Sequence, residues 1–341
     1  MRAERVLLAR TQGVSLEGLR ISPRTRNAWV EVYASTDVVL DRLLVTAAGT
    51  PYAAGVELPR SSHVTIRRSV FTHCGDRTPA WSNCLLLGWV SHLTVEDSWF
   101  HDCYGCDFVH GRFATDLRLI GNRLERALPC RIGRVRCGHQ DLVELFAGNG
   151  LTVVGNHFGV YRIGGAQLYF TDATDHVIVE NNVFVGADPR VPGYQARVAM
   201  IVGSRGYLRV PHDVRIVNNT ILTGARRNDG YEGSIRMSSM YGAIPLHQRP
   251  LVANNVIGLL EDPRHVCAET QASVDNVVLQ GTGCSRSDRV GDAGLDGRGR
   301  PTAGSALLID RASRRYAPSR DVTGRPRGPA PDIGAYEYRY R

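Results

Sequence analysis

An eight-residue pattern recurs along this 341-residue chain, and it reads apolar-x-apolar-x-x-Asn/Ser-x-Phe/Leu/Ile. Clear copies are VTIRRSVF from Val64, LTVEDSWF from Leu93, LRLIGNRL from Leu117, LTVVGNHF from Leu151, VIVENNVF from Val177 and VRIVNNTI from Val214. Weaker copies begin at Val14, Val38 and Leu251, and successive copies start 24 to 37 residues apart. Self-similarity at this period is typical of a solenoid, in which each repeat buries its apolar face against its neighbours.

A second periodicity indicates strands rather than helices. Eight residues before most anchors lies another apolar residue that begins its own alternating stretch, as in Val6/Val14, Val30/Val38, Val56/Val64, Leu85/Leu93, Val109/Leu117, Val143/Leu151 and Tyr169/Val177. Each coil should therefore carry at least two short strands, with a third expected. We predict an all-β, single-stranded, right-handed parallel β-helix of about nine to ten coils, with equivalent strands about 4.8 Å apart. It should span residues 1–285, and residues 286–341 should form an irregular tail that packs on it.

The repeat accounts for one set of polar residues as structure. Asn122, Asn156, Asn182, Asn219 and Asn255 fall in one column or nearly so. We expect them to stack as a ladder inside a turn, hydrogen-bonded to the backbone, and to take no part in catalysis.

The eight cysteines predict an oxidising compartment. Their columns favour the pairs Cys74–Cys103, Cys84–Cys106, Cys130–Cys137 and Cys267–Cys284, with Cys74–Cys84 and Cys103–Cys106 as a competing set. No zinc-ligand spacing is present, so no metal site is predicted. We expect a secreted protein whose leader is absent from this chain, because charges interrupt the opening MRAERVLLAR.

The charge indicates an anionic partner. The net charge is +8, and all 41 basic residues are Arg, so mechanisms with a Lys base are excluded. The arginines are scattered and form no nucleic-acid-binding motif. No apolar run is long enough to span a membrane. We therefore expect a monomer that binds a polysaccharide or oligosaccharide, with an acidic carbohydrate favoured over nucleic acid as the anionic partner, and that binds no membrane.

The C-terminal run 296–338, which ends in PDIGAYEY, resembles the ending of many secreted bacterial right-handed β-helix proteins of the pectate-lyase-like superfamily. The segments HQDLVELFAGNGLTVVGNHF and AQLYFTDATDHVIVENNVF are similar to central coils of its carbohydrate-active members, which include polysaccharide lyases, uronan epimerases and some glycoside hydrolases. The resemblance covers essentially the whole chain and implies fold and carbohydrate context more than reaction.

The chain departs from that superfamily in two ways. Its lyases often use a Lys or Arg base with bound calcium, so the resemblance allows calcium as a cofactor. Here Lys is absent and no compact set of acidic residues stands out. Members also usually begin with a capping segment, whereas Val6 already belongs to a coil, and the sequence allows that N-terminal coils are missing.

Residues seven and five positions before each anchor should face solvent from one sheet. The first column reads Glu31, Glu57, Leu86, His110, Glu144 and Phe170, and the second reads Tyr33, Pro59, Gly88, Arg112, Phe146 and Asp172. The candidate catalytic residues are Glu144, Asp172, Asp141, His110 and His139. The candidate substrate-binding residues are Arg112, Phe146, Tyr161, Arg162, Tyr169, Phe170 and Arg197. Asp107 and Asp141 share a further polar column at the start of the strands, which either adds to this patch or caps turns.

These residues suit more than one reaction. For β-elimination from a uronate, an Arg would neutralise the carboxylate and His110, His139 or a Tyr would remove the α proton. For hydrolysis, Glu144 would pair with Asp172 or Asp141. A cleaving enzyme is favoured, with lyase chemistry ahead of hydrolysis, and a non-catalytic glycan-binding or cell-surface protein is the third possibility.

Overall fold

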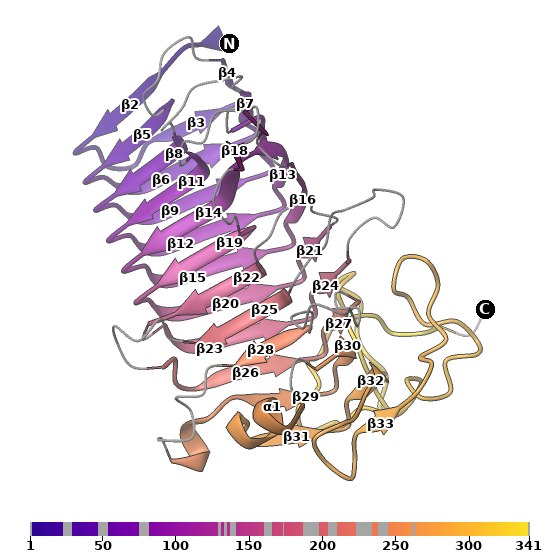
Figure 1. Cartoon of the computed structure of the whole chain (residues 1–341). Helices are drawn as coiled ribbons and strands as arrows, with labels where there is room; N and C mark the ends of the chain where they lie inside the picture. Colours follow the sequence, from indigo (N-terminus) through magenta and orange to yellow (C-terminus); the bar gives the residue numbers. More distant parts are fainter. Residues whose placement is uncertain are drawn as a thin grey trace.

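The chain folds as a right-handed parallel β-helix in which three long sheets run the length of the molecule. A computed structural model describes residues 2–22, 29–46, 54–74, 82–128, 131–132, 135–136, 141–159, 166–172, 174–186, 198–203, 210–222, 234–237, 245–260 and 263–339. Figure 1 shows the coils stacked from the N-terminal strand downward, with the C-terminal residues beside the last coils. The predicted fold is confirmed.

The three sheets take one strand each from successive coils, and neighbouring strands within each sheet are parallel. Sheet B contains β2 (Val6–Ala9), β5 (Val30–Tyr33), β8 (Ala54–Pro59), β11 (Ser82–Gly88), β14 (Cys106–Arg112), β19 (Val143–Phe146), β22 (Ala166–Thr171), β25 (Val198–Gly203) and β28 (Ile235–Met237). Sheet C contains β3 (Ser15–Glu17), β6 (Thr36–Asp41), β9 (Ser62–Arg67), β12 (Ser91–Glu96), β15 (Thr115–Ile120), β20 (Asn149–Val154), β23 (Asp175–Glu180), β26 (Val214–Val217), β29 (Leu251–Ala253) and β31 (Ala272–Val274).

Sheet A closes the coil and supplies the expected third strand. It contains β1 (Arg2–Ala3), β4 (Arg20–Ile21), β7 (Leu44–Thr46), β10 (Val70–Thr72), β13 (Trp99–Tyr104), β16 (Arg123–Leu128), β21 (His157–Phe158), β24 (Val183–Phe184), β27 (Thr220–Ile221), β30 (Val256–Leu259), β32 (Val277–Gln280) and β33 (Arg289–Val290). The remaining elements are β17 (Arg131–Ile132), β18 (Val135–Arg136), the 3-10 helix η2 (Leu246–Gln248) and α1 (Pro263–Glu269). Among the described residues no helix is long and apolar enough to cross a bilayer.

The core forms because alternate residues of each strand point inward and meet the same position of the next coil. Val109, Val143 and Leu168 are successive partners in sheet B, and Leu117, Leu151 and Val177 are successive partners in sheet C. Aromatic rings stack in the same way, with Phe71 on Phe100 and Phe158 on Phe184 at 4.5 Å between centroids. Burial of these columns supplies the main driving force for the fold.

The asparagine ladder forms as expected. Each amide Nδ2 donates to the Oδ1 atom of the next asparagine at 3.0 Å, from Asn122 through Asn156, Asn182, Asn219 and Asn255 to Asn276. Each side chain also bonds backbone atoms of adjacent coils, so the buried amides are satisfied and the turns are held in register.

A second column of asparagines docks the C-terminal tail. Asn181, Asn218 and Asn254 immediately precede ladder residues and adopt left-handed backbone angles. Their Nδ2 atoms donate to the carbonyl oxygens of Arg320, Asp332 and Ser313, respectively. The doubled asparagines of the later coils therefore combine an inward ladder residue with an outward residue that holds the tail. The predicted boundary at residues 285/286 remains a prediction.

Two of the disulfides join the end of a sheet A strand to the start of the next sheet B strand, and the third joins α1 to the residues after β32. The bonds are Cys74–Cys84, Cys103–Cys106 and Cys267–Cys284. The predicted pairs Cys74–Cys103 and Cys84–Cys106 are therefore wrong in this structure, and the competing set is the one present. Cys130–Cys137 lies outside the described residues.

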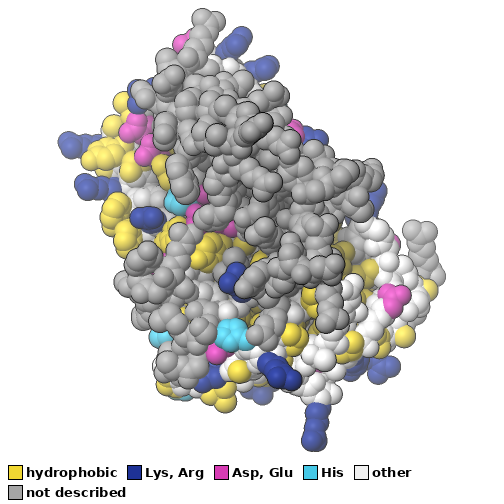
Figure 2. All heavy atoms as spheres, in the orientation of Figure 1, with side chains coloured by type: hydrophobic (Ala, Val, Ile, Leu, Met, Phe, Trp, Pro, Cys, Tyr) yellow, Lys and Arg dark blue, Asp and Glu magenta, His cyan; other side chains and the backbone are white. Residues whose placement is uncertain are grey.

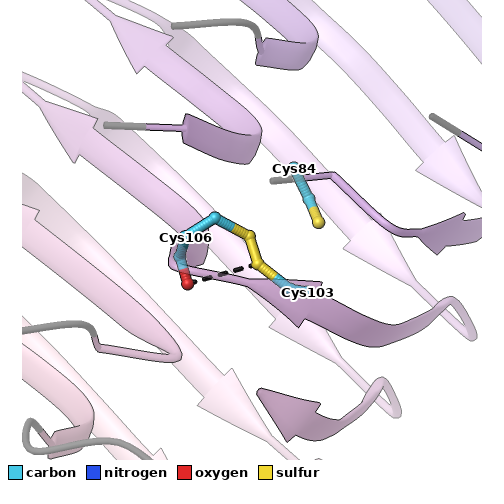
Figure 3. A group of neighbouring side chains, drawn as sticks. All are labelled: Cys84, Cys103 and Cys106. Atoms are coloured by element: carbon cyan, nitrogen blue, oxygen red, sulfur yellow. Dashed lines mark hydrogen bonds between the residues drawn. A yellow bond between two sulfur atoms is a disulfide. The ribbon is translucent and has the colours of Figure 1, made fainter. Parts of the chain in front are cut away.

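Stacking of β10 on β13 does bring Cys74 and Cys103 into one column, because Thr72 pairs with His101. The corner between sheets A and B nevertheless brings Cys74 within 5.0 Å of Cys84, measured between Cα atoms. Gly105, with φ of 66°, turns the chain between Cys103 and Cys106. Figure 3 shows these two cysteines beside Cys84 of the preceding coil, and the three sulfur atoms lie within 4.8 Å of one another.

Candidate functional site

Three titratable side chains meet on the outer face of sheet B, and we name Asp107, His110 and Glu144 the His110 cluster. His110 on β14 is the direct partner of Glu144 on β19. The His110 Nδ1 atom lies 3.0 Å from Glu144 Oε2 and 3.2 Å from Asp107 Oδ2. Both carboxylates are almost completely buried, and the imidazole is mostly buried. The sequence places His110 and Glu144 on adjacent coils, and the structure brings them into contact.

A β-bulge explains how Asp107 reaches His110. In a regular strand, residues three apart point to opposite faces. Here the N–H groups of Phe108 and Val109 both donate to the Leu142 carbonyl, so two residues of β14 oppose one residue of the next coil. Both side chains are buried, and the extra residue returns Asp107 to the face that carries His110.

The two carboxylates fix the state of the imidazole. Burial lowers the pKa of His110, but hydrogen bonds and charge from Asp107 and Glu144 outweigh it and raise the pKa to about 9. Both bonds are to Nδ1, and the structure gives Nε2 no hydrogen bond among the described residues. The cluster therefore orients an imidazole whose Nε2 can give or take a proton.

Asp107 has a second contact that links it to the next coil. Its Oδ1 accepts the N–H of Asp141 at 2.9 Å, and an Asp141 oxygen in turn accepts the N–H of Ala166. Burial raises the pKa of Asp107 to about 6, and the charges of Asp141 and Glu144 add to that shift, while His110 opposes it. Asp141 is 1% exposed, so the structure places it in the turn-capping column rather than on the open face.

An aromatic and cationic row borders the His110 cluster. Arg112 pairs with Phe146, and its guanidinium carbon lies 5.2 Å from the centre of that ring. The Phe146 ring is tilted against His110 at 5.7 Å and edge-on to Tyr169 at 6.2 Å. Arg112 is exposed, whereas Phe146 and Tyr169 are buried. Strand residues two apart share a face about 7 Å apart, so the Arg112 charge and the His110 imidazole face the same volume.

Two predicted residues lie elsewhere because the register changes by one in this coil. Leu168, not Tyr169, pairs with Val143, which leaves nine residues instead of eight before Val177. Tyr169 is consequently the partner of Glu144, while Phe170 pairs with Leu145 and is fully buried in the core. The prediction that Phe170 faces substrate is wrong.

The same shift moves Asp172 off the sheet. Thr171 takes the position beside Phe146 that the sequence assigns to Asp172. Asp172 follows the strand with φ of 52°, and its N–H donates to the Gly203 carbonyl. It is 5% exposed in a turn, so the predicted column of Arg112, Phe146 and Asp172 is wrong. The predicted residues His139, Tyr161, Arg162 and Arg197 lie outside the described residues.

The sequence leaves the role of Asp107 open between turn capping and the candidate patch, and only the bulge reveals its contact with His110. It does not single out two further residues of this face. Trp89 and Phe113, which follow the strands of sheet B, are exposed and stacked with centroids 5.0 Å apart. Bulky aromatic residues directly after the outward column were the signal for them.

The donor set of the His110 cluster does not suit calcium. The three side-chain donor atoms lie within 4.8 Å of one another. Calcium takes six to eight oxygen ligands, whereas two side chains here offer oxygen and the third offers nitrogen. The Asp107 carboxylate is already bonded to the Asp141 N–H. We therefore derive no step through calcium.

Comparison with known proteins supports the fold. No protein-family model matches the chain, and no curated protein matches it in sequence. Seven solved chains match in structure. Pectate lyase Pel9A is 13% identical with a TM-score of 0.54, over 95% of this chain and 87% of the lyase. PfbA, a surface adhesin of Streptococcus pneumoniae, is 12% identical with a TM-score of 0.46, over 63% of this chain and 55% of the adhesin. The match therefore spans about half of the adhesin.

Proposed function

We propose that this chain is an extracellular enzyme that cleaves an acidic polysaccharide by β-elimination at the His110 cluster. The observation that carries the proposal is the imidazole of His110, which Asp107 and Glu144 hold through Nδ1. The exposed Arg112 lies two residues further along the same strand. Three disulfides favour an oxidising compartment, and the fold resemblance to pectate lyase Pel9A adds carbohydrate context.

The two parts of the reaction need different groups. A uronate resists loss of its α proton because the carboxylate is negative, so a cation must neutralise that charge. Arg112 suits this role because its guanidinium is always protonated and can bind a carboxylate through two N–H groups. It lies on the face of the sheet that carries His110, as substrate binding across both residues requires.

His110 then acts as the base. Its neutral form would keep the proton on Nδ1, donated to a carboxylate, and present the lone pair of Nε2 to the substrate. Nε2 takes the α proton, the electron pair forms a double bond to the β carbon, and the glycosidic C–O bond breaks. The leaving oxygen takes a proton from the imidazolium or from water. Asp107 and Glu144 orient the ring and stabilise the charge it gains.

A specific observation also favours hydrolysis as the second candidate. Asp107 has a pKa raised to about 6 and lies in the same cluster as Glu144. A retaining glycosidase uses two close carboxyl groups, one protonated as the acid and one as the nucleophile. Asp107 would protonate the leaving oxygen and Glu144 would attack.

The products separate the two reactions. The full chain is incubated with polygalacturonate, alginate and a neutral glucan, and both unsaturated-uronate absorbance and new reducing ends are measured. Elimination gives both signals from a uronate polymer, and the His110→Gln variant should lose about 100-fold or more of the rate. Reducing ends without unsaturated product would support hydrolysis, and binding without either signal would leave a non-catalytic glycan-binding protein.

A further inference from the structure

Two successive turns after sheet B each carry an exposed aromatic side chain, Trp89 after β11 and Phe113 after β14. We name this pair the aromatic platform. Trp89 is 64% exposed and Phe113 is 43% exposed, and their rings stack at an interplanar angle of 22°. Among the described residues the other exposed large apolar side chains are aliphatic and lie on separate elements: Leu7, Ile178, Leu246 and Val290. Single exposed apolar residues need no explanation, whereas an adjacent aromatic pair indicates a binding surface.

Local structure does not account for these two residues. From β2 to β22, each turn from sheet B to sheet C holds one residue in the left-handed region at this position, and Trp89 and Phe113 have φ of 51° and 57°. The same column holds Ala34, Ala147 and Asp172 in other coils. The left-handed region favours Gly, Asn and Asp rather than bulky side chains. The aromatic rings therefore neither shape the turn nor fill the core.

The charges beside the aromatic platform are complementary to an acidic chain. Arg60 precedes Trp89 in the column, and Arg112 precedes Phe113 in the sequence. Both guanidinium groups are exposed, and neither is paired with a carboxylate in the described part of the chain. Gly88, next to Trp89, leaves open space where a Cβ would lie. Figure 2 shows hydrophobic and basic side chains side by side along the left edge of the molecule, where sheet B turns into sheet C.

We propose that the aromatic platform with Arg60 is a second binding subsite, and that it takes a uronate residue of the polysaccharide next to the one that Arg112 binds at the His110 cluster. Sugar rings have apolar faces of C–H groups that pack on aromatic rings, and the arginines bind their carboxylates. Arg112 directly precedes Phe113 and shares β14 with His110, which makes the platform continuous with the His110 cluster. This inference rests on the proposed function for its ligand.

Binding of galacturonate oligomers of increasing length tests the subsite. Titration calorimetry is done in a His110→Gln background, which stops turnover if His110 is the base. Trp89→Ala/Phe113→Ala should weaken binding of long oligomers about 10-fold or more, with a smaller effect on the shortest. The single variant Trp89→Phe, which keeps an aromatic ring at this position, should keep most of the affinity. Ile178→Ala removes an exposed apolar side chain from sheet C and is the matched control, with affinity unchanged.

The outcomes separate this subsite from the proposed function. Equal affinity of the platform double variant and the control for every oligomer overturns the subsite. Loss of affinity only in the platform variant, with no unsaturated product from the unmodified chain, supports the subsite and overturns β-elimination. Absence of binding to any uronate oligomer by the unmodified chain overturns both. Thermal unfolding of each variant is recorded so that misfolding is not read as lost affinity.

Discussion

The Nδ1 atom of His110 lies 3.0 Å from Glu144 Oε2 across two adjacent coils. Hydrogen bonds and charge from Asp107 and Glu144 outweigh burial and raise the pKa of His110 to about 9, so the imidazole is protonated at neutral pH. A base must be deprotonated to act. The rate of β-elimination should therefore rise with pH and level off above about 9. Initial rates of unsaturated-product formation from pH 6 to 10.5 measure this limb.

The second candidate reaction has the opposite pH dependence. Hydrolysis with Asp107 as the acid needs its protonated form, and its pKa is about 6. That rate should fall as pH rises above 6. A reducing-end assay that declines between pH 5 and 8 would therefore contradict the role of His110 as a base.

Glu144→Gln should lower the pKa of His110, because it removes one of the two negative charges beside the ring. The rising limb should move to lower pH by about one unit. The variant is compared with Glu57→Gln, which changes another carboxyl of sheet B that lies two coils before His110. An unchanged pH profile in Glu144→Gln would mean that Glu144 does not act on the ring in solution.

The same pair predicts how stability depends on pH. A histidine with a raised pKa stabilises the folded state fully below its ordinary pKa near 6.5, and that stabilisation is lost as pH rises through about 9. The difference in unfolding free energy between the unmodified chain and His110→Gln should therefore be largest near pH 6. It should shrink by pH 9.5. Urea unfolding at the two pH values measures it, and a difference that grows with pH would contradict the ion pair.

The disulfides can be mapped by two proteases. Cleavage after Arg places Cys74 in the peptide 69–77 and the next three cysteines together in 78–112, and further cleavage after Glu96 separates Cys84 from Cys103 and Cys106. With the bonds of the structure, 69–77 is linked to 78–96, and 97–112 is a separate peptide that loses its internal bond on reduction. If all three peptides remain linked, the pairing across coils is correct instead.

The columns of the coil could be predicted from the sequence because each apolar alternation meets its copy in the next coil. Val109 and Val143 are partners as the eight-residue offset requires, and so are His110 and Glu144. The offset fails where a turn gains a residue. The turn after Thr171 does so, and a one-residue slip exchanges the inward and outward faces of the strand before it. For that reason the eight-residue offset predicts Phe170 on the outer face and Tyr169 in the core, whereas the structure has Tyr169 outside and Phe170 inside.

Asp107 could not be predicted because its contact depends on a bulge. Nothing in the letters CDFVH distinguishes a regular strand from one in which two successive N–H groups share a carbonyl. The predicted pairing of Cys74 with Cys103 and of Cys84 with Cys106 is wrong for a related reason. Column position is a property of the stacked strands, whereas the bonds form at the corner between sheets, where the chain path is set by loop geometry.

The register at Phe170 is open to direct test. Phe170→Ala should lower the free energy of unfolding by about 3–5 kcal/mol, because it removes a fully buried ring. Tyr169→Ala changes the adjacent residue, whose ring lies on the outer face against Phe146. It should cost no more than about 2 kcal/mol. Urea unfolding of the two variants distinguishes the registers, and a larger loss in Tyr169→Ala would restore the eight-residue offset.

A buried ion pair should decide whether the C-terminal tail stays on the coils. Arg327 donates to Glu337 at 3.1 Å and to Asn181 Oδ1 at 2.8 Å, and both charged side chains are buried. Arg327→Met would leave Glu337 without its cation, at a cost of about 3–5 kcal/mol. Adding Glu337→Gln should recover part of that loss, because the uncompensated charge is gone. Hydrogen exchange of residues 310–339 measures docking, with the exposed Arg325→Met as the control. If Arg327→Met exchanges as slowly as that control, the pair does not hold the tail.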